Sequence, residues 1–340
     1  MHVATTLKLA FVGCGAISHY HLSGIKDAGA RVEVTAAIDP DAENARVIAK
    51  ETGAAVFGSL EEGLAQGDFD AVDVMVPHDL HEPLAIKALA AGKHVLLEKP
   101  MAPTLEACDR ILAAAKESSC VFMVGENSQY WPEVVAAQEL IEQGAIGEVV
   151  TARAAIAYET DEYWLQGDRP WRLERGRTGG GIAIDSGPHW IRPLRMWMGE
   201  IDEVIAVLDY PSKRMEGESL ARALLRFRSG KVAGFDALEM DSPLGPDDWF
   251  HVVGTKGEMV IGGGFDGALT LYDEAHREGM KIENTTGYFN SFGPELEDFA
   301  SAVLDGTPPV AGPEQSLGEL RTALAIYRSA KTRQWEKVWN

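Results

Sequence analysis

Lys99 has the neighbours expected of a lysine that takes part in proton transfer. It stands in Glu98-Lys99-Pro100, directly after the apolar residues 94–97. Pro100 disfavours helical geometry at Lys99, so the side chain can project from the end of an extended strand. If the ammonium group is partly desolvated, it loses proton affinity and approaches the range useful for general acid–base catalysis. A surface lysine paired with Glu98 is the alternative.

Asp185 and His189 form a second pair suited to acid–base chemistry. They are four residues apart in the stretch from Gly179 to His189, where a helix is predicted to begin. Residues four apart on a helix share a face. Asp185 is therefore expected to orient His189 or to bind a substrate hydroxyl, while the imidazole passes a proton near neutral pH. The alternatives are that Asp185 caps the helix and that His189 is an interior residue.

A glycine-bearing turn separates the first predicted strand from the first predicted helix. Gly13 and Gly15 lie in Gly13-Cys14-Gly15-Ala16-Ile17-Ser18, which follows the apolar residues 7–12. Without side chains the backbone turns sharply, and a dinucleotide pyrophosphate can approach the N–H groups of a helix N-terminus. Because Ser18 replaces the third glycine of the G-x-G-x-x-G pattern, a plain strand-to-helix turn is the alternative.

Asp39 ends the second predicted strand, about where that pattern places a carboxylate for the ribose hydroxyls. The carboxylate would repel a 2′-phosphate, and no Arg or Lys lies between Asp39 and Arg46 to receive one. The sequence therefore predicts NAD as the cofactor, with NADP less favoured. Opening the turn before Pro40 is the alternative role of Asp39, and both roles can coexist.

The residues up to about 126 alternate short apolar strands with helical segments, which is typical of an α/β fold with a doubly wound parallel sheet. Lys99 would then lie at the carboxyl edge of that sheet, where such folds bind ligands. Strands are predicted at 7–12, 32–38, 71–76, 94–97 and 121–124, and helices at 17–28, 41–52, 80–91 and 104–118, the last capped by Thr104.

Beyond residue 126, β-branched and alternating runs favour a large, open, mostly antiparallel sheet. We therefore expect two domains, a dinucleotide-binding domain over 1–126 and a substrate-binding and oligomerisation domain over 127–340. A sheet with helices on one face leaves the other face to be covered, which predicts a homo-oligomer, a dimer or tetramer. Strands are predicted at 149–158, 204–208, 220–227, 232–238 and 250–253, helices at 133–143, 186–198, 294–305 and 314–330, and turns at 229–230, 254–257 and 262–264.

The 340-residue chain carries a formal net charge of −21. Nucleic acids and anionic membranes would repel such a surface, so neither is expected as a partner. No stretch of about twenty apolar residues occurs, and the first six residues lack the basic start of a signal peptide, which predicts a cytoplasmic protein. Cys14, Cys108 and Cys120 are an odd number without C-x-x-C spacing, so we expect reduced, packed thiols and no metal site.

Taken together, these motifs resemble the glucose-fructose oxidoreductase, inositol dehydrogenase and MocA (Gfo/Idh/MocA) family. The resemblance implies an N-terminal Rossmann domain, a C-terminal α/β domain with a large open sheet, and NAD- or NADP-dependent oxidation or reduction of sugars, cyclitols and related alcohols. It also implies that Lys99, Asp185 and His189 form the catalytic set. The resemblance covers essentially the full length of the chain. The matching motifs are residues 13–17, Pro77 with His81, residues 91–95 leading into Glu98-Lys99-Pro100, and residues 180–189.

We therefore expect hydride transfer from a secondary alcohol to NAD, or the reverse, with Lys99 taking the hydroxyl proton or binding the developing oxyanion. His189 would relay that proton or act as an alternative base, and Asp185 would hold an adjacent hydroxyl. Two other functions remain open on the same fold. One is an NAD-dependent glycosidase or lyase that oxidises a ring carbon transiently and then returns the hydride. The other is a non-catalytic dinucleotide sensor.

Candidate binding residues follow from the motifs and from the resemblance. For the coenzyme they are Gly13, Gly15, Ala16, Ile17, Asp39, Pro77, His81, Glu98 and Lys99, although His81 has helix packing as its alternative role. For the substrate they are Asn127, Tyr130, Trp164, Trp171, Arg172 and Arg192. The two tryptophans, with Tyr163, could stack on a sugar ring or simply pack in a core or interface. Asn127, Gln129 and Tyr130 have loop hydrogen bonding as their alternative.

Positive charge is concentrated beside the Asp185 motif. Recognition of a carboxylate or phosphate on the substrate is one interpretation, because guanidinium groups bind both in a bidentate manner. Ion pairing across a subunit interface is the preferred alternative. Arg192 also stands where many relatives have an acidic residue, which argues against carrying over the substrate of inositol dehydrogenase. The arginines are Arg169, Arg172, Arg175, Arg177, Arg192 and Arg195.

Overall fold

The computed structural model describes residues 5–28, 31–165, 170–242, 244–245, 248–262, 267–283 and 287–339. The chain forms two compact units. The first comprises Met1–Glu126, Tyr163–Trp171 and Phe292–Leu317, and the second comprises Asn127–Glu162, Arg172–Ser291 and Gly318–Asn340. Two segments from beyond residue 126 therefore belong to the first unit.

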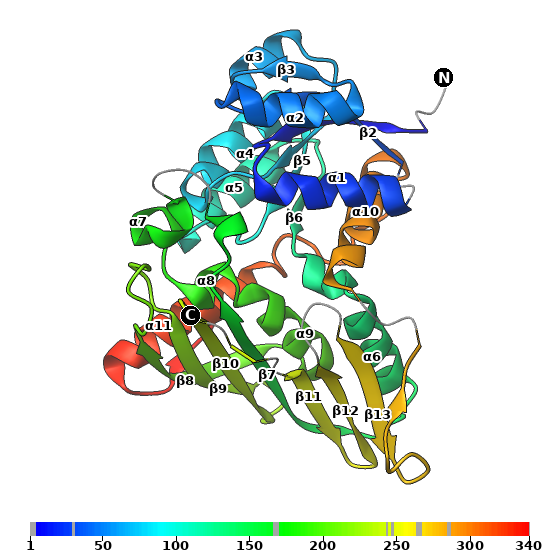
Figure 1. Cartoon of the computed structure of the whole chain (residues 1–340), viewed down its shortest axis with the longest axis vertical. Coiled ribbons are helices and arrows are strands. Elements are labelled where there is room, and N and C mark those ends of the chain that lie inside the picture. Colours follow the sequence, from blue (N-terminus) through cyan, green and yellow to red (C-terminus); the bar gives the residue numbers. More distant parts are fainter. Residues whose placement is uncertain are drawn as a thin grey trace. The chain divides into compact units, whose positions relative to one another are not determined.

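A six-stranded parallel sheet forms the centre of the first unit, with the strand order β3-β2-β1-β4-β5-β6 (Figure 1). Leu9, Ala10 and Phe11 of β1 are fully buried, as expected for a parallel strand covered on both faces. The strand order reverses between β1 and β4, and such sheets bind ligands at the carboxyl ends near this point. The strands are β1 Leu7–Val12, β2 Val32–Ile38, β3 Ala55–Phe57, β4 Ala71–Val74, β5 His94–Glu98 and β6 Phe122–Gly125.

Three of the helices beside this sheet begin after residues suited to cap them. Asp41, Ser59 and Thr104 each accept a hydrogen bond from a backbone N–H in the first turn of α2, α3 and α5. Helix α10 packs against α1 so closely that a Cβ at Gly24 would lie 2.6 Å from the backbone nitrogen of Gly293. The helices are α1 Ala16–Ala28, α2 Ala42–Thr52, α3 Leu60–Gln66, α4 His81–Ala90, α5 Leu105–Glu117 and α10 Phe292–Leu304.

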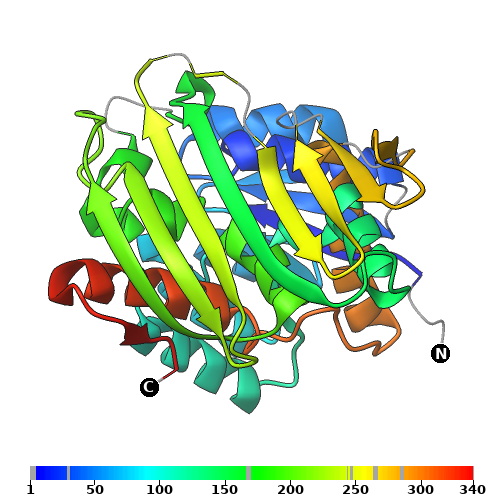
Figure 2. The ribbon, with the colours of Figure 1, turned by 90° about the horizontal axis from the view of Figure 1, so that it is seen from below.

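The second unit contains a nine-stranded sheet in the order β14-β13-β12-β11-β7-β10-β9-β8-β15 (Figure 2). Only β7 and β10 pair in parallel, and the other neighbours are antiparallel. The prediction of a mostly antiparallel sheet is therefore confirmed. The strands are β7 Val149–Glu159, β8 Ile201–Asp209, β9 Leu220–Phe227, β10 Val232–Met240, β11 Asp248–Gly254, β12 Gly257–Gly262, β13 Ala268–Asp273, β14 Met280–Lys281 and β15 Glu336–Lys337.

The helices of the second unit cover one face of this sheet. Along β9 the residues alternate between buried and more exposed positions, with Ala221, Ala223 and Leu225 buried, because the helices meet only that face. Figure 2 shows the broad face of the sheet that has no helix in front of it. The helices are α6 Pro132–Glu142, α7 Arg175–Thr178, α8 Ile182–Asp185, α9 Pro188–Met198 and α11 Leu317–Thr332.

The sequence prediction missed short or glycine-flanked elements. Strand β3 has three residues and helix α3 has seven, so neither shows a clear period. Strands β12 and β13 were also missed, because glycines mark the ends of β12 more strongly than its alternation does. The predicted turn at 254–257 joins β11 to β12. Residues 263 and 264 of the predicted turn at 262–264 lie outside the described residues.

Candidate active site

The loop between β1 and α1 has the local geometry of a phosphate-binding turn. Gly13 has a φ of +91°, and a Cβ there would lie 2.2 Å from the carbonyl oxygen of Met75, so only glycine fits. Helix α1 has no acidic residue in its first turn, which leaves its N-terminus favourable for an anion. The buried Ser18 hydroxyl donates to the carbonyl oxygen of Gly15 at 2.7 Å, so serine fits the third position of the pattern.

Asp39 fixes this loop from the end of β2. Its Oδ2 accepts a hydrogen bond from the Cys14 N–H at 2.8 Å, and its Oδ1 accepts one from the Asp41 N–H at 2.8 Å. The hydrogen bond from the Asp41 N–H forms the turn that the sequence suggested for Asp39. Each carboxylate oxygen has more than one lone pair, so the same group can also accept a ribose hydroxyl. The donors and acceptors of this unit thus fit a dinucleotide.

Lys99 directly follows β5 at the carboxyl edge of the parallel sheet. Its backbone N–H donates to Glu98 Oε2 at 3.1 Å. His81 is fully buried nearby, with Nδ1 2.9 Å from the carbonyl oxygen of Pro100 and Nε2 2.9 Å from that of Val76. Burial and the neighbouring His78 lower the pKa of His81 to about 4, so its ring is neutral at pH 7.

As a neutral ring, His81 donates to only one of these two carbonyl oxygens and packs against the other. This contact matches the packing role that was left open for His81. Pro77 precedes the short 3-10 helix η1, His78–Leu80, as its N-terminal cap residue. Pro77, His81, Glu98 and Lys99 consequently belong to neighbouring segments at one edge of the sheet.

Asp185 and His189 lie on two helices and not on one. Helix α8 ends at Asp185, and α9 begins at Pro188 after Ser186 and Gly187. Proline favours the first turn of a helix, and the N-cap residue of α9 is Gly187. The prediction that the pair shares one helix face is therefore wrong, and Asp185 does not take the alternative role of capping this helix.

Arg172 is the residue that holds the Asp185 carboxylate. Its Nη1 donates to Oδ1 at 2.7 Å and to Oδ2 at 2.8 Å. Both side chains are mostly buried, with 22% and 17% exposure, so this charged pair keeps its geometry better than a surface pair would. Arg172 was predicted near the substrate, and its contact with Asp185 was not foreseen.

His189 is 8% exposed and surrounded by aromatic rings. The ring centroids of Trp131, Trp190 and Tyr288 lie 5.9, 6.0 and 6.2 Å from that of His189. Such a setting limits the orientations of the imidazole. Trp131 is fully buried and was missed by the sequence analysis, although it directly follows the candidate residue Tyr130.

The glycines before Asp185 are required by close packing. A Cβ at Gly180 would lie 2.0 Å from Tyr327 Oη, and one at Gly181 would lie 1.9 Å from the carbonyl oxygen of Glu218. The Glu218 carboxylate accepts hydrogen bonds from the N–H groups of Gly181 at 3.0 Å and Ala183 at 2.9 Å. Glu218 and Tyr327 therefore position the segment that leads to Asp185. No sequence pattern pointed to either residue.

Trp164, Trp171 and Asn127, which are further substrate candidates, each contact residues of their own unit. Trp164 stacks on Tyr20, with centroids 5.5 Å apart, and Trp171 meets the edge of the His78 ring at 4.7 Å. Asn127 Nδ2 donates to Ser291 Oγ at 2.9 Å in the second unit. Asn127 and Tyr130 are both buried, within the 3-10 helix η2, Asn127–Tyr130.

Comparison with known proteins decides the family. Residues 7–126 match the model of an oxidoreductase family with an NAD-binding Rossmann fold, and residues 134–260 match the GFO/IDH/MocA C-terminal domain. A 1,5-anhydro-D-fructose reductase from Ensifer adhaerens is 30% identical over 314 residues, which cover 90% of this chain and 91% of the relative. The chain belongs to the Gfo/Idh/MocA oxidoreductase family.

Other family members are similar to this chain over nearly its full length. A D-xylose 1-dehydrogenase [NADP(+)] from Haloarcula marismortui is 26% identical, over 96% of this chain and 91% of its own. The structure of an oxidoreductase from Thermotoga maritima is 31% identical with a TM-score of 0.85, covering 98% of both chains. The WlbA dehydrogenase from Bordetella pertussis, solved with NADH and UDP-GlcNAcA, is 25% identical with a TM-score of 0.86 and 99% coverage of both chains.

Several arginines of this Gfo/Idh/MocA protein are paired within the chain. Arg192 and Arg195 are 4% and 7% exposed, and both contact the buried carboxylate of Glu319, with Arg192 Nε at 3.2 Å. Arg195 Nη2 also donates to Glu200 at 2.6 Å. The ion pairing that we preferred to an anionic substrate therefore occurs for these residues inside the chain, without a subunit interface. Arg169 lies outside the described residues.

Two features are absent from the part of the chain that the structure describes. No helix there is long and apolar enough to span a membrane. No cluster of three or more His, Cys, Asp or Glu side chains there could hold a metal ion.

Proposed function

We propose that this oxidoreductase transfers hydride between a nicotinamide coenzyme, NAD in preference to NADP, and a secondary hydroxyl or carbonyl group of a sugar, sugar derivative or cyclitol. The position of Lys99, directly after β5 at the ligand-binding edge of a dinucleotide-type sheet, is the observation that carries the proposal. The relatives that act on anhydrofructose and xylose support the substrate class.

The bound coenzyme supplies the hydride acceptor or donor. Lys99 takes the proton of the reacting hydroxyl or donates a hydrogen bond to its developing oxyanion, which makes the carbon a better hydride donor. His189 relays that proton or serves as an alternative base. Asp185, held by Arg172, binds an adjacent hydroxyl. The three free cysteines fit a reducing compartment, so a cytoplasmic location belongs to this proposal.

The test is a panel of polyols, aldoses, uronates and glycosides with NAD and with NADP. Nicotinamide absorbance and product mass are followed together. Net NADH with an oxidised sugar product supports the proposal. Cleavage of a glycoside without net NADH would replace it with redox-assisted cleavage, and bound nucleotide without turnover of any compound would favour a sensor. Faster turnover of uronates than of neutral sugars would indicate an anionic substrate.

The NAD preference depends on the charge of Asp39. The D39N variant keeps an oxygen for one of the two backbone N–H groups but removes the charge that repels a 2′-phosphate. We expect the ratio of kcat/KM for NAD to that for NADP to fall roughly tenfold, about 1.4 kcal/mol. The control is D70N, which removes the same charge at Asp70, before β4 at the opposite edge of the sheet. An unchanged ratio in D39N would remove the basis for the NAD assignment.

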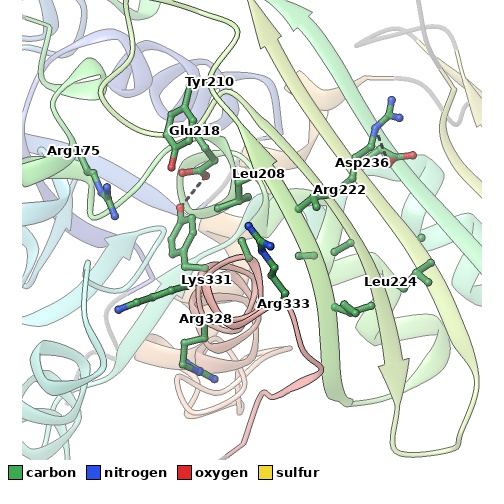
Figure 3. A pocket seen from close by; sticks show the side chains of 17 residues that line it. Arg175, Leu208, Tyr210, Glu218, Arg222, Leu224, Asp236, Arg328, Lys331 and Arg333 are labelled. Carbon is green, nitrogen blue, oxygen red and sulfur yellow. Dashed lines mark hydrogen bonds and ion pairs between the residues drawn. The ribbon is translucent and has the colours of Figure 1, made fainter.

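The open face of the nine-stranded sheet supports the proposed homo-oligomer. Val207 of β8 and Leu224 of β9 point from this face and are 64% and 50% exposed. Beside them, Asp236 pairs with Arg153 at 3.3 Å and with Arg222 at 3.4 Å, so the centre of the face does not share the excess negative charge of the whole chain. A groove of about 1110 Å³ is lined by residues of β8, β9, β10 and α11 (Figure 3). A second copy of the chain is the occupant we propose.

The L224E variant tests this interface by placing a charge on the face. We expect the wild type to sediment as a dimer or larger oligomer and L224E to sediment as a monomer, because a buried unpaired carboxylate is strongly unfavourable. V310E is the matched control, since Val310 is 63% exposed and belongs to the first unit. A wild-type protein that stays a monomer at high concentration would exclude the proposed oligomer.

A further inference from the structure

A buried group of ionisable side chains lies beside the strand that leads to Lys99. His21 of α1 is fully buried between Asp73 of β4 and Glu98 of β5. Its Nδ1 is 2.7 Å from Asp73 Oδ2, and its Nε2 is 3.0 Å from Glu98 Oε1. The imidazole therefore joins the helix after the glycine loop to two neighbouring strands of the parallel sheet.

The two short contacts define the protonation state of His21. A carboxylate can only accept, so both ring nitrogens can donate only when the imidazole is an imidazolium. Burial of the ring opposes this charge, but Asp73 and Glu98 outweigh burial and raise the pKa of His21 well above its usual range. Burial also raises the pKa of Asp73, and the charge on His21 counteracts that rise.

Other acids face the same group from neighbouring elements. Glu295 of α10 is fully buried, and neither of its carboxyl oxygens has a hydrogen-bond partner among the described residues. Burial raises the pKa of Glu295 well above its usual range. Glu126, which follows β6, also raises the pKa of Glu295. His21 is thus the basic group that faces both the Asp73 and the Glu98 carboxyl groups in this interior.

Glu98 connects the buried group to the main chain of Lys99. While Oε1 faces His21, Oε2 accepts the Lys99 N–H at 3.1 Å. The following residue, Pro100, has no N–H, so Lys99 supplies the only backbone donor of this residue pair. On the far side, the Pro100 carbonyl oxygen meets His81. The backbone N–H of Lys99 is therefore held by a carboxyl group that itself contacts His21.

We propose that His21 is a positioning residue for Lys99: its two ring N–H groups orient Glu98, whose second oxygen fixes the backbone N–H of Lys99. This inference rests on the proposed function, in which the Lys99 side chain handles the proton of the reacting hydroxyl. His21 acts through Glu98 and needs no contact with coenzyme or substrate. A small displacement of Lys99 is sufficient to slow the reaction, because proton transfer depends steeply on geometry.

The first test is the H21Q variant. A glutamine amide cannot donate from two opposite atoms, so either Asp73 or Glu98 loses its donor. We expect faster hydrogen exchange at the Lys99 amide and a kcat roughly tenfold or more below wild type. The dissociation constant for NAD, measured by titration, is expected to stay within about twofold, because Asp39 and Ser18 make the hydrogen bonds that fix the glycine loop.

The second test restores the hydrogen-bond pattern without a charge. In the H21Q/E98Q double variant, the amide introduced at position 21 can donate to Asp73 and accept from the amide introduced at position 98. The oxygen of that second amide can still accept the Lys99 N–H. We expect the double variant to show slower Lys99 amide exchange and higher kcat than H21Q alone. A merely structural role would instead make the two substitutions additive, or worse together.

The control is R31M. Arg31 follows α1 and contacts α10, so this substitution weakens that contact without affecting Glu98. Arg31 Nε pairs with Glu297 at 2.9 Å, and Arg31 Nη2 pairs with Asp305 at 2.7 Å. R31M is expected to lower thermal stability and to leave kcat and Lys99 exchange near wild type. If R31M lost activity as H21Q does, general loosening of α1 would explain both variants.

Measurements on the wild-type protein keep the inference testable even if H21Q does not fold. The ¹⁵N shifts of the His21 ring are expected to show two protonated nitrogens at pH 7.5, and the Lys99 amide is expected to exchange slowly. A neutral ring with one bare nitrogen, or an unprotected Lys99 amide, would overturn the inference. If K99M turns over normally, the proposed function fails, whereas loss in K99M with normal kcat in H21Q contradicts only the role of His21.

Discussion

Replacing Lys99 with methionine is expected to lower kcat about 10²–10⁴-fold, the usual contribution of a positioned acid–base group. Methionine keeps much of the side-chain length and apolar volume but cannot take or donate the proton of the reacting hydroxyl. The backbone N–H of residue 99 can still donate to Glu98, so the end of β5 should keep its conformation. The dissociation constant for NAD, measured by titration, should therefore change by no more than a fewfold.

The K99R variant separates charge from proton transfer. Arginine keeps the positive charge but stays protonated at any working pH, so it cannot act as a base. If K99R is as slow as K99M, Lys99 transfers a proton. If K99R regains most of the activity, Lys99 acts by stabilising the oxyanion and His189 becomes the candidate base. A near-normal kcat in K99M would remove Lys99 from the mechanism altogether.

Most strands of the parallel sheet could be predicted from the sequence, because their signals are local. The apolar runs of β1 and β2, the glycine turn and the cap at Thr104 each depend on a few neighbouring residues. The position of Lys99 could also be predicted, because it depends only on where one strand ends. The positive φ of Gly13 shows why that glycine could be recognised from the sequence.

The details of the candidate site did not follow, because they depend on residues far apart in the chain. The Asp185 partner, Arg172, is 13 residues away across two breaks in helical structure. Glu218 is 37 residues from Gly181, and the contacts of His21 with Asp73 and Glu98 span 52 and 77 residues. A spacing of four between Asp185 and His189 suggested one helix, but a local pattern could not show that Ser186 and Gly187 interrupt it.

The stability of the second unit is expected to depend on pH through Glu133, which lies in α6. Its side chain is fully buried, and neither carboxyl oxygen has a hydrogen-bond partner among the described residues. Burial raises the pKa of Glu133 from its ordinary 4.5 to about 7. Above pH 7 the folded protein must therefore hold a buried carboxylate that the unfolded chain exposes to water.

The sign of the pH dependence follows from the raised pKa. Below pH 4.5 the carboxyl is protonated in both states, so it does not affect the free energy of unfolding. As the pH rises from 4.5 towards 7, the unfolded chain ionises first and the folded state loses stability. Above pH 7 the loss levels off at about 3 kcal/mol, the cost of this difference in pKa.

The E133Q variant should remove this loss, because glutamine has nearly the same shape and does not ionise. We expect E133Q to exceed wild type in free energy of unfolding by up to about 3 kcal/mol at pH 8, and by less than about 1 kcal/mol at pH 5. Urea unfolding followed by tryptophan fluorescence measures it, since Trp131 lies two residues away. E139Q, at an exposed position of the same helix, should show no such gain. Equal gains for E133Q at both pH values would mean that the Glu133 carboxyl does not titrate in the folded state as burial requires.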